Sequence, residues 1–60
     1  MRLVIADDAI LVREGLARLL AASGFDVVGE ASDATELLSL VETERPDVAI
    51  VDIRMPPTHT

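Results

Sequence analysis

The run Val48-Ala49-Ile50-Val51 constrains the fold of this chain more than any other stretch. These four apolar residues lead directly into the carboxylate of Asp52, and Pro56 follows shortly afterwards. A short apolar run closed by Pro predicts a strand over residues 48–52 that is buried on both faces, as in a parallel sheet. Asp52 would end that strand, at the sheet edge where open α/β folds bind their ligands.

The beginning of the chain repeats this arrangement. Residues 3–6 predict a first strand, and Asp7 and Asp8 follow it directly. A helix is predicted from Ala9 to about Ala22, because apolar residues recur at helical spacing and Gly24 supplies a left-handed stop. The face that this spacing is expected to bury consists of Val12, Leu16, Leu19 and Leu20.

The middle of the chain predicts a second strand and a second helix. Residues 25–30 mix apolar and polar side chains, which favours an edge position in the sheet. Asp33 and Glu36 have the spacing of a capping box, with Asp in place of Ser or Thr, and mark the start of the helix. Pro46 ends the helix, because the residue before Pro disfavours the helical conformation. The expected buried face of this helix consists of Leu37, Leu38, Leu40 and Val41.

The order of these elements, β-α-β-α-β, predicts the α/β fold class. Each connection is long enough for a helix, so parallel strands are favoured over hairpins. Right-handed crossovers with one helix on each face place the first strand in the middle, in the order 2-1-3. Asp7, Asp8 and Asp52 then meet at one rim. The apolar third strand is left as an open edge, which natural domains avoid, so we expect something to cover it.

Composition restricts the class of protein further. Sixty residues make at most one small domain with a thin margin of stability, since such a chain buries only about 60% of the surface it exposes when unfolded. Without Cys there is no disulfide and no thiolate metal site. We expect a cytoplasmic protein without membrane contact, because neither a signal peptide nor a membrane span is recognisable. The net charge of -6 disfavours direct binding of nucleic acid.

The three aspartates predict a site for a divalent cation. Carboxylates about 4 Å apart repel one another by roughly 4 kcal/mol per pair at an effective dielectric near 20. Mg²⁺ relieves such repulsion, and it is typically held by one or two carboxylates, water and a substrate phosphate. Asp52 is the expected nucleophile for an aspartyl phosphate, with Asp7 and Asp8 orienting the metal. The structural alternative makes Asp7 or Asp8 a helix N-cap and Asp52 a turn residue.

Three other residues were weighed for a role at this rim. The backbone carbonyl of Arg54 follows Asp52 by two residues, within reach of the same metal. His59 is interpreted as a solvated side chain, because the sequence offers it no partner. Glu30 ends a strand, as the ribose-binding acid of dinucleotide-binding folds does, but the first turn lacks the glycine-rich fingerprint. We therefore expect no nucleotide cofactor.

Two motifs resemble the receiver domain of bacterial two-component response regulators. They are Asp7-Asp8 after the first strand and Asp52-Ile53-Arg54-Met55-Pro56 after the third. Residues 12–16 and 27–31 are similar to the LuxR/NarL-type branch, which carries a DNA-binding output domain and regulates transcription. The resemblance implies that Asp52 accepts a phosphoryl group from a sensor histidine kinase. It also implies that Asp7, Asp8, Asp52 and the carbonyl of Arg54 surround Mg²⁺.

The chain departs from the pattern of that family in its length. The family's CheY-like, flavodoxin-like doubly wound fold has five strands, and its switch Ser/Thr and its Lys lie in parts that would follow Thr60. The chain has no Lys, and Thr58 and Thr60 stand too soon after Asp52 to be the switch residue. Residues 1–60 are therefore expected to form the N-terminal part of a receiver domain, which is not an enzyme.

Two rival functions stay open at this point. The first is a Mg²⁺-dependent phosphohydrolase with an aspartyl nucleophile, which usually needs a second acid two residues after the nucleophile, where this chain has Arg54. The second is a structural or oligomerisation fragment without activity. Such a fragment would form a homodimer, or recruit further polypeptide, through the open edge of its third strand.

Overall fold

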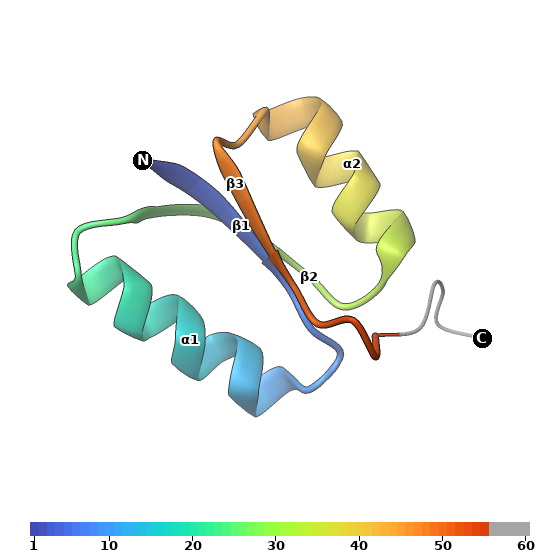
Figure 1. Cartoon of the computed structure of the whole chain (residues 1–60), viewed down its shortest axis with the longest axis horizontal. Coiled ribbons are helices and arrows are strands. Elements are labelled where there is room, and N and C mark those ends of the chain that lie inside the picture. The colour runs from blue at the N-terminus through green and yellow to red at the C-terminus, as the bar shows by residue number, and fades with distance from the viewer. Residues whose placement is uncertain (56–60) are drawn as a thin grey trace.

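The computed structural model describes residues 1–55 and contains five elements in the predicted order. The three strands form one parallel sheet in the order β2-β1-β3. Figure 1 shows the two helices on opposite sides of this sheet. The α/β class and the strand order 2-1-3 are confirmed. The elements are β1 (Arg2–Ala6), α1 (Ile10–Ala22), β2 (Asp26–Ala31), α2 (Ala34–Glu44) and β3 (Val48–Val51).

The register between β1 and β3 decides where these strands end. Their pairing runs without a break from Leu3 opposite Val48 to Ala6 opposite Val51. The N–H of Asp52 continues the ladder by donating to the carbonyl of Ala6 at 2.9 Å. The residue after β1 and the residue after β3 therefore leave the sheet at the same level.

The core of the described residues is the central strand. Leu3, Val4, Ile5 and Ala6 of β1 are each at most 2% exposed, and Ala31 at the end of β2 is 1% exposed. A central strand is covered by one helix on each face and by a neighbouring strand on each side. The buried apolar surface is thus concentrated in β1.

The prediction that the third strand is buried on both faces is wrong. Val48 and Val51 of β3 are 40% and 42% exposed. The reason is packing, because α1 and α2 contact β1 and β2 and neither helix packs against β3. The apolar edge that the sequence analysis expected is therefore present, with nothing among residues 1–55 covering it.

The apolar stripes of the helices are only partly buried, which corrects the expectation that they form the core. Val12 and Leu19 of α1 are 58% and 67% exposed, and Leu38 of α2 is 63% exposed. Each helix contacts β1 and β2 but not β3, so part of its apolar stripe has no strand beneath it. Within residues 1–55, no helix combines the length and apolarity that crossing a bilayer requires.

The helices begin and end where local signals place them. The Asp33 carboxylate caps α2 by accepting the N–H of Glu36 at 2.8 Å. The Glu36 carboxylate reaches back to the N–H of Ser32 at 2.9 Å, one residue before the N-cap. Gly24, after α1, takes the predicted left-handed conformation at φ 95°, and Arg45 ends α2 at φ 47°. The predicted cap and stops are confirmed.

Gly29 in β2 lets α2 approach the sheet closely. A Cβ atom at this position would lie 2.7 Å from the Cδ2 atom of Leu40 on α2. The absence of a side chain thus provides the space that half-buried Leu40 fills.

Removing the cap of α2 gives the first testable prediction. We expect Asp33→Ala to lower the free energy of unfolding by about 1 kcal/mol, because the N–H of Glu36 loses its acceptor. Urea denaturation followed by far-ultraviolet circular dichroism measures this loss. Thr35→Ala is the matched control, since its exposed side chain in the same turn makes no hydrogen bond within residues 1–55. Equal losses in the two variants would contradict the cap.

Candidate metal centre

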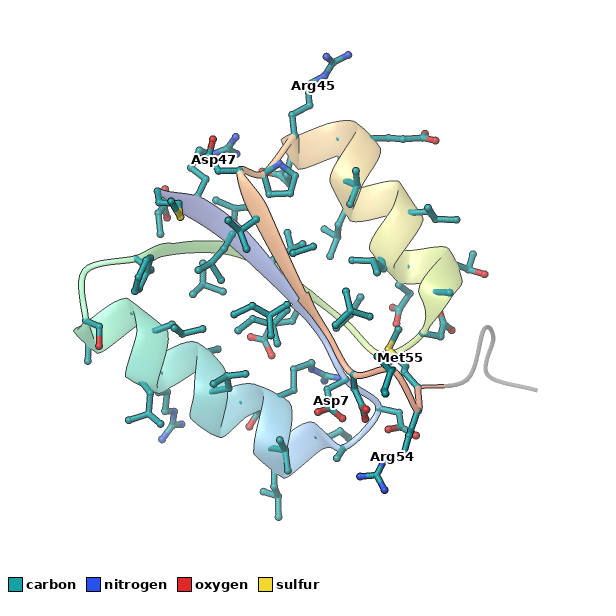
Figure 2. The ribbon with its side chains drawn as sticks, viewed as in Figure 1. Asp7, Arg45, Asp47, Arg54 and Met55 are labelled. Carbon is teal, nitrogen blue, oxygen red and sulfur yellow. The ribbon has the colours of Figure 1, made fainter. Side chains whose placement is uncertain are left out.

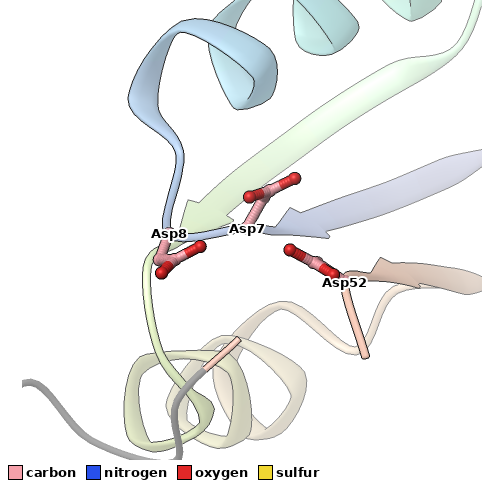
Figure 3. Close-up of side chains that lie close together, drawn as sticks. All are labelled: Asp7, Asp8 and Asp52. Atoms are coloured by element: carbon pink, nitrogen blue, oxygen red, sulfur yellow. The ribbon is translucent and has the colours of Figure 1, made fainter. Parts of the chain in front are cut away.

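Three carboxylates gather at the carboxyl end of the sheet, as Figure 3 shows. One oxygen atom each from Asp7, Asp8 and Asp52 lies within 4.8 Å of the other two. Asp7 and Asp8 come from the turn between β1 and α1, and Asp52 directly follows β3. The structure thus brings together the three residues that the topology placed at one rim.

The backbone and the side chain of Asp7 are both held in place. Its N–H donates to the carbonyl of Ala31 at 3.0 Å, and its carbonyl accepts from Nη1 of Arg13 at 3.0 Å. Its Oδ1 accepts the N–H of Ala9 at 2.9 Å. The N-cap of α1 is Ala9 and has no side-chain cap, so the alternative in which Asp7 or Asp8 is the N-cap is wrong.

Asp52 stands in a tight turn and keeps one carboxylate oxygen available. Its Oδ1 accepts the N–H of Arg54 at 3.0 Å, and its carbonyl accepts the N–H of Met55 at 3.1 Å. The alternative in which Asp52 shapes a turn is therefore correct. The turn, however, uses only one of the two carboxylate oxygens of Asp52. Its Oδ2 has no hydrogen-bond partner within residues 1–55.

Asp8 completes the cluster from the solvent side. Its side chain is exposed and forms no hydrogen bond or ion pair to the other described residues. An unrestrained carboxylate is able to adjust to a ligand without breaking an existing contact. The cluster therefore combines two oriented carboxylates with one adjustable carboxylate.

The donor set and its spacing fit Mg²⁺. This ion takes hard oxygen ligands at 2.0–2.1 Å in an octahedron, so two ligands on opposite sides of it are about 4.2 Å apart. The observed upper limit of 4.8 Å exceeds this separation only slightly. The side chain of Asp8 forms no hydrogen bond or ion pair within residues 1–55 that would prevent it from closing this difference.

A cavity of about 360 Å³ adjoins the acidic cluster. Asp7, Asp52 and Arg54 line its polar rim, and Figure 2 shows Asp7 and Arg54 at the same end of the sheet. The apolar lining of the cavity comes from α1 and from the ends of β1 and β3, through Ile5, Val12, Leu16, Ile50 and Val51.

The metal-binding role of the Arg54 carbonyl stays a prediction. The predictions for Pro56, Thr58, His59 and Thr60 concern residues outside the described range 1–55.

One contact at this site is not predictable from the sequence pattern. Arg13 of α1 donates to the carbonyl of Asp7 and, through Nε, to the Glu30 carboxylate at 3.1 Å. Six residues separate Arg13 from Asp7, and no local motif predicts that their groups meet. Only the tertiary structure indicates this contact, because the strand register pairs Glu30 with Ile5, close to Asp7.

Comparison with known proteins assigns the chain to a family. The family model described as response regulator receiver domain matches residues 3–59. Over 55 residues the chain is 44% identical to the transcriptional regulatory protein PdtaR of Mycobacterium tuberculosis, covering 92% of this chain and 27% of that protein. The solved signal receiver domain of NarL from the same organism is 50% identical, with a TM-score of 0.87, over 92% of this chain and 45% of that chain.

The matched relatives differ in what their names say they do. A protein-glutamate methylesterase/protein-glutamine glutaminase of Haloarcula marismortui is 41% identical over 56 residues, covering 93% of this chain and 15% of that protein. The chain thus spans about a quarter of PdtaR and less of the methylesterase. The shared segment is common to a transcription regulator and an enzyme, so it does not by itself determine the activity of the whole protein.

The acidic cluster generates a prediction for metal binding. We expect Asp52→Asn to weaken Mg²⁺ binding by about tenfold or more, since even partners behind the metal ligands contribute 10–100-fold. Isothermal titration calorimetry suits this chain, because it has no Trp and no Tyr to report binding by fluorescence. Asp47→Asn is the control with the same change in charge, at the opposite end of β3. Equal Mg²⁺ affinity in the parent and in Asp52→Asn would count against the site.

Proposed function

The chain belongs to the response regulator receiver domain family, and from this premise we propose that it is a phosphoacceptor module of a two-component system. In this proposal Asp52 accepts a phosphoryl group from the phosphohistidine of a sensor histidine kinase. The supporting observation is the acidic cluster, in which one oxygen of Asp52 lies within 4.8 Å of oxygens from Asp7 and Asp8. Asp7 and Asp8 hold Mg²⁺, together with Asp52 and the backbone carbonyl of Arg54.

The hydrogen bonds of Asp52 support different tasks for its two oxygens in this proposal. Oδ1 is held by the N–H of Arg54, which orients the carboxylate. Oδ2 is the nucleophile: it attacks phosphorus, the P–N bond to the kinase histidine breaks, and an acyl phosphate forms on Asp52. When bound, Mg²⁺ would offset the negative charge of the phosphoryl oxygens, which three carboxylates alone would repel. Asp7 and Asp8 thus serve by holding the cation beside the acceptor.

The residues around the cluster favour an acceptor over a phosphohydrolase. Arg54 lies two residues after Asp52, at the position where such a hydrolase usually has its second acid. Within residues 1–55, no further Asp, Glu or His joins the three aspartates. The site therefore offers a nucleophile and metal ligands without a separate general acid or base. We propose that the module itself is not an enzyme.

The whole protein is proposed to regulate transcription in the cytoplasm. PdtaR, of which this chain spans 27%, is named a transcriptional regulatory protein. We propose that residues 1–60 form the N-terminal part of a receiver domain and that an output domain outside them binds DNA. The net charge of -6 fits this division, because an acidic segment repels the phosphate backbone. Phosphorylation would act by shifting a two-state equilibrium of the receiver.

Phosphorylation of Asp52 is directly measurable. After incubation with Mg²⁺ and acetyl phosphate, we expect intact-mass spectrometry to show a gain of one phosphoryl group on the chain. Asp52→Asn should show no gain, because the amide is not a nucleophile for this reaction. Asp47→Asn, which changes the net charge equally, should still be phosphorylated. A gain that persists in Asp52→Asn would assign the acceptor elsewhere.

The open edge of β3 supports a second proposal, that two copies of the chain associate there. Val48 and Val51 are 40% and 42% exposed, and neither helix packs against β3. A strand edge that lacks a partner presents unpaired backbone groups, and a second β3 related by two-fold symmetry is able to pair with them. A homodimer would therefore bury apolar surface that is exposed in the monomer.

Self-association through β3 makes its own prediction. We expect Ala49→Lys, which places a charge on this edge strand, to shift the mass measured by sedimentation equilibrium from dimer to monomer. Ser39→Lys, on an exposed position of α2, is the control and should leave the dimer intact. A parent chain that is monomeric at all accessible concentrations would refute this interface.

A further inference from the structure

We propose that Arg13 is a positioning residue for the acidic cluster, acting by fixing the turn that carries Asp7 and Asp8. The proposal rests on the Mg²⁺ site inferred above and adds a residue that does not touch the metal. Arg13 belongs to the first turn of α1, outside the turn that carries Asp7 and Asp8. Its role follows from what its guanidinium contacts.

The guanidinium of Arg13 joins the turn to the sheet. Its Nη1 donates to the backbone carbonyl of Asp7 at 3.0 Å, and its Nε donates to the Glu30 carboxylate at 3.1 Å. The side chain of Arg13 is only 15% exposed, whereas that of Glu30 is 36% exposed. The planar guanidinium presents its donors in fixed directions, so holding Nε on Glu30 also orients Nη1 toward Asp7.

Asp7 is consequently held through both of its backbone polar groups. Its N–H is bonded to Ala31 at the end of β2, and its carbonyl is bonded to Arg13. Because these two bonds restrict rotation of the peptide planes on either side of Asp7, they also direct its carboxylate. Asp8 follows in the chain and its side chain makes no hydrogen bond or ion pair within residues 1–55, so it depends on the same turn for its position.

Helix stability does not explain why a cation stands at this position. The N-terminal turn of a helix carries a partial positive charge, so Arg is electrostatically unfavourable there. α1 has no acidic residue in its first turn to compensate, and Ala9 provides no side-chain cap. The contacts of Arg13 with Asp7 and Glu30 therefore account for its presence better than the helix does.

Positioning and simple electrostatics predict opposite signs for the same substitution. Removing the positive charge of Arg13 near three carboxylates should, by Coulomb attraction alone, make Mg²⁺ bind more tightly. Loss of the hydrogen bond to Asp7 should make Mg²⁺ bind more weakly, because the ligands lose their arrangement. Partners that orient metal ligands typically contribute 10–100-fold in affinity, so we expect Arg13→Gln to weaken binding about tenfold.

The test is a calorimetric Mg²⁺ titration of the 60-residue parent chain, Arg13→Gln and Arg18→Gln. Arg18 is the matched control, because it lies on α1, is exposed, and makes no hydrogen bond or ion pair to the described residues. The second measurement is the Mg²⁺ dependence of phosphorylation by acetyl phosphate. For Arg13→Gln we expect the half-saturating Mg²⁺ concentration to rise about tenfold, with the rate at saturating Mg²⁺ nearly unchanged.

The outcomes separate this inference from the proposed function. If the parent chain binds no Mg²⁺, the metal site itself fails and Arg13 has nothing to position. If the parent binds Mg²⁺ and Arg13→Gln binds it equally well or more tightly, the positioning role is overturned. The role is also overturned if Arg18→Gln weakens Mg²⁺ binding as much as Arg13→Gln does. Circular dichroism checks folding of each variant. If Arg13→Gln does not fold, Arg13→Lys is tested instead, because it keeps the positive charge but loses the planar guanidinium. Weaker Mg²⁺ binding by Arg13→Lys supports the positioning role. Mg²⁺ affinity equal to that of the parent overturns it.

Discussion

The uninterrupted parallel pairing of β1 with β3 is the constraint on which the rest of this structure depends. Ala6 pairs with Val51, so the strands release Asp7 and Asp52 at the same level. A shift of one residue in this register would displace one carboxylate by about 3.3 Å along the strand and turn it to the other face of the sheet. The approach of Asp7 to Asp52 is therefore a consequence of strand register, whereas the position of Asp8 depends on the turn that follows β1.

The same topology explains why so little of the chain is deeply buried. A three-stranded sheet has one central strand, and here that strand supplies all but one of the buried apolar residues. The two edge strands and several residues of both helical stripes remain partly exposed. Surface of this kind destabilises an isolated domain and favours association with further polypeptide. The acidic cluster lies at the end of the best buried strand.

Segments similar to this chain occur in proteins with different names. One is named as a transcription regulator and another as a methylesterase. The function of a protein depends on the residues of its site more than on its fold. In this chain the acidic cluster is confined to the turns after β1 and β3. Its geometry depends on β1, β3 and the neighbouring end of β2, all of which lie within this chain.

The sequence by itself determined the order of the elements, their ends and the meeting of the three aspartates. These features follow from local signals, such as the Asp33 cap, Gly24 and Pro46, together with the handedness of crossovers between parallel strands. The extent of burial was decided by tertiary packing, because periodicity shows that Val12 and Leu19 form a stripe but not how far a sheet extends beneath it. The contact of Arg13 with the carbonyl of Asp7 was also decided there. It requires β2 to bring Glu30 beside the turn, and no local pattern encodes that approach.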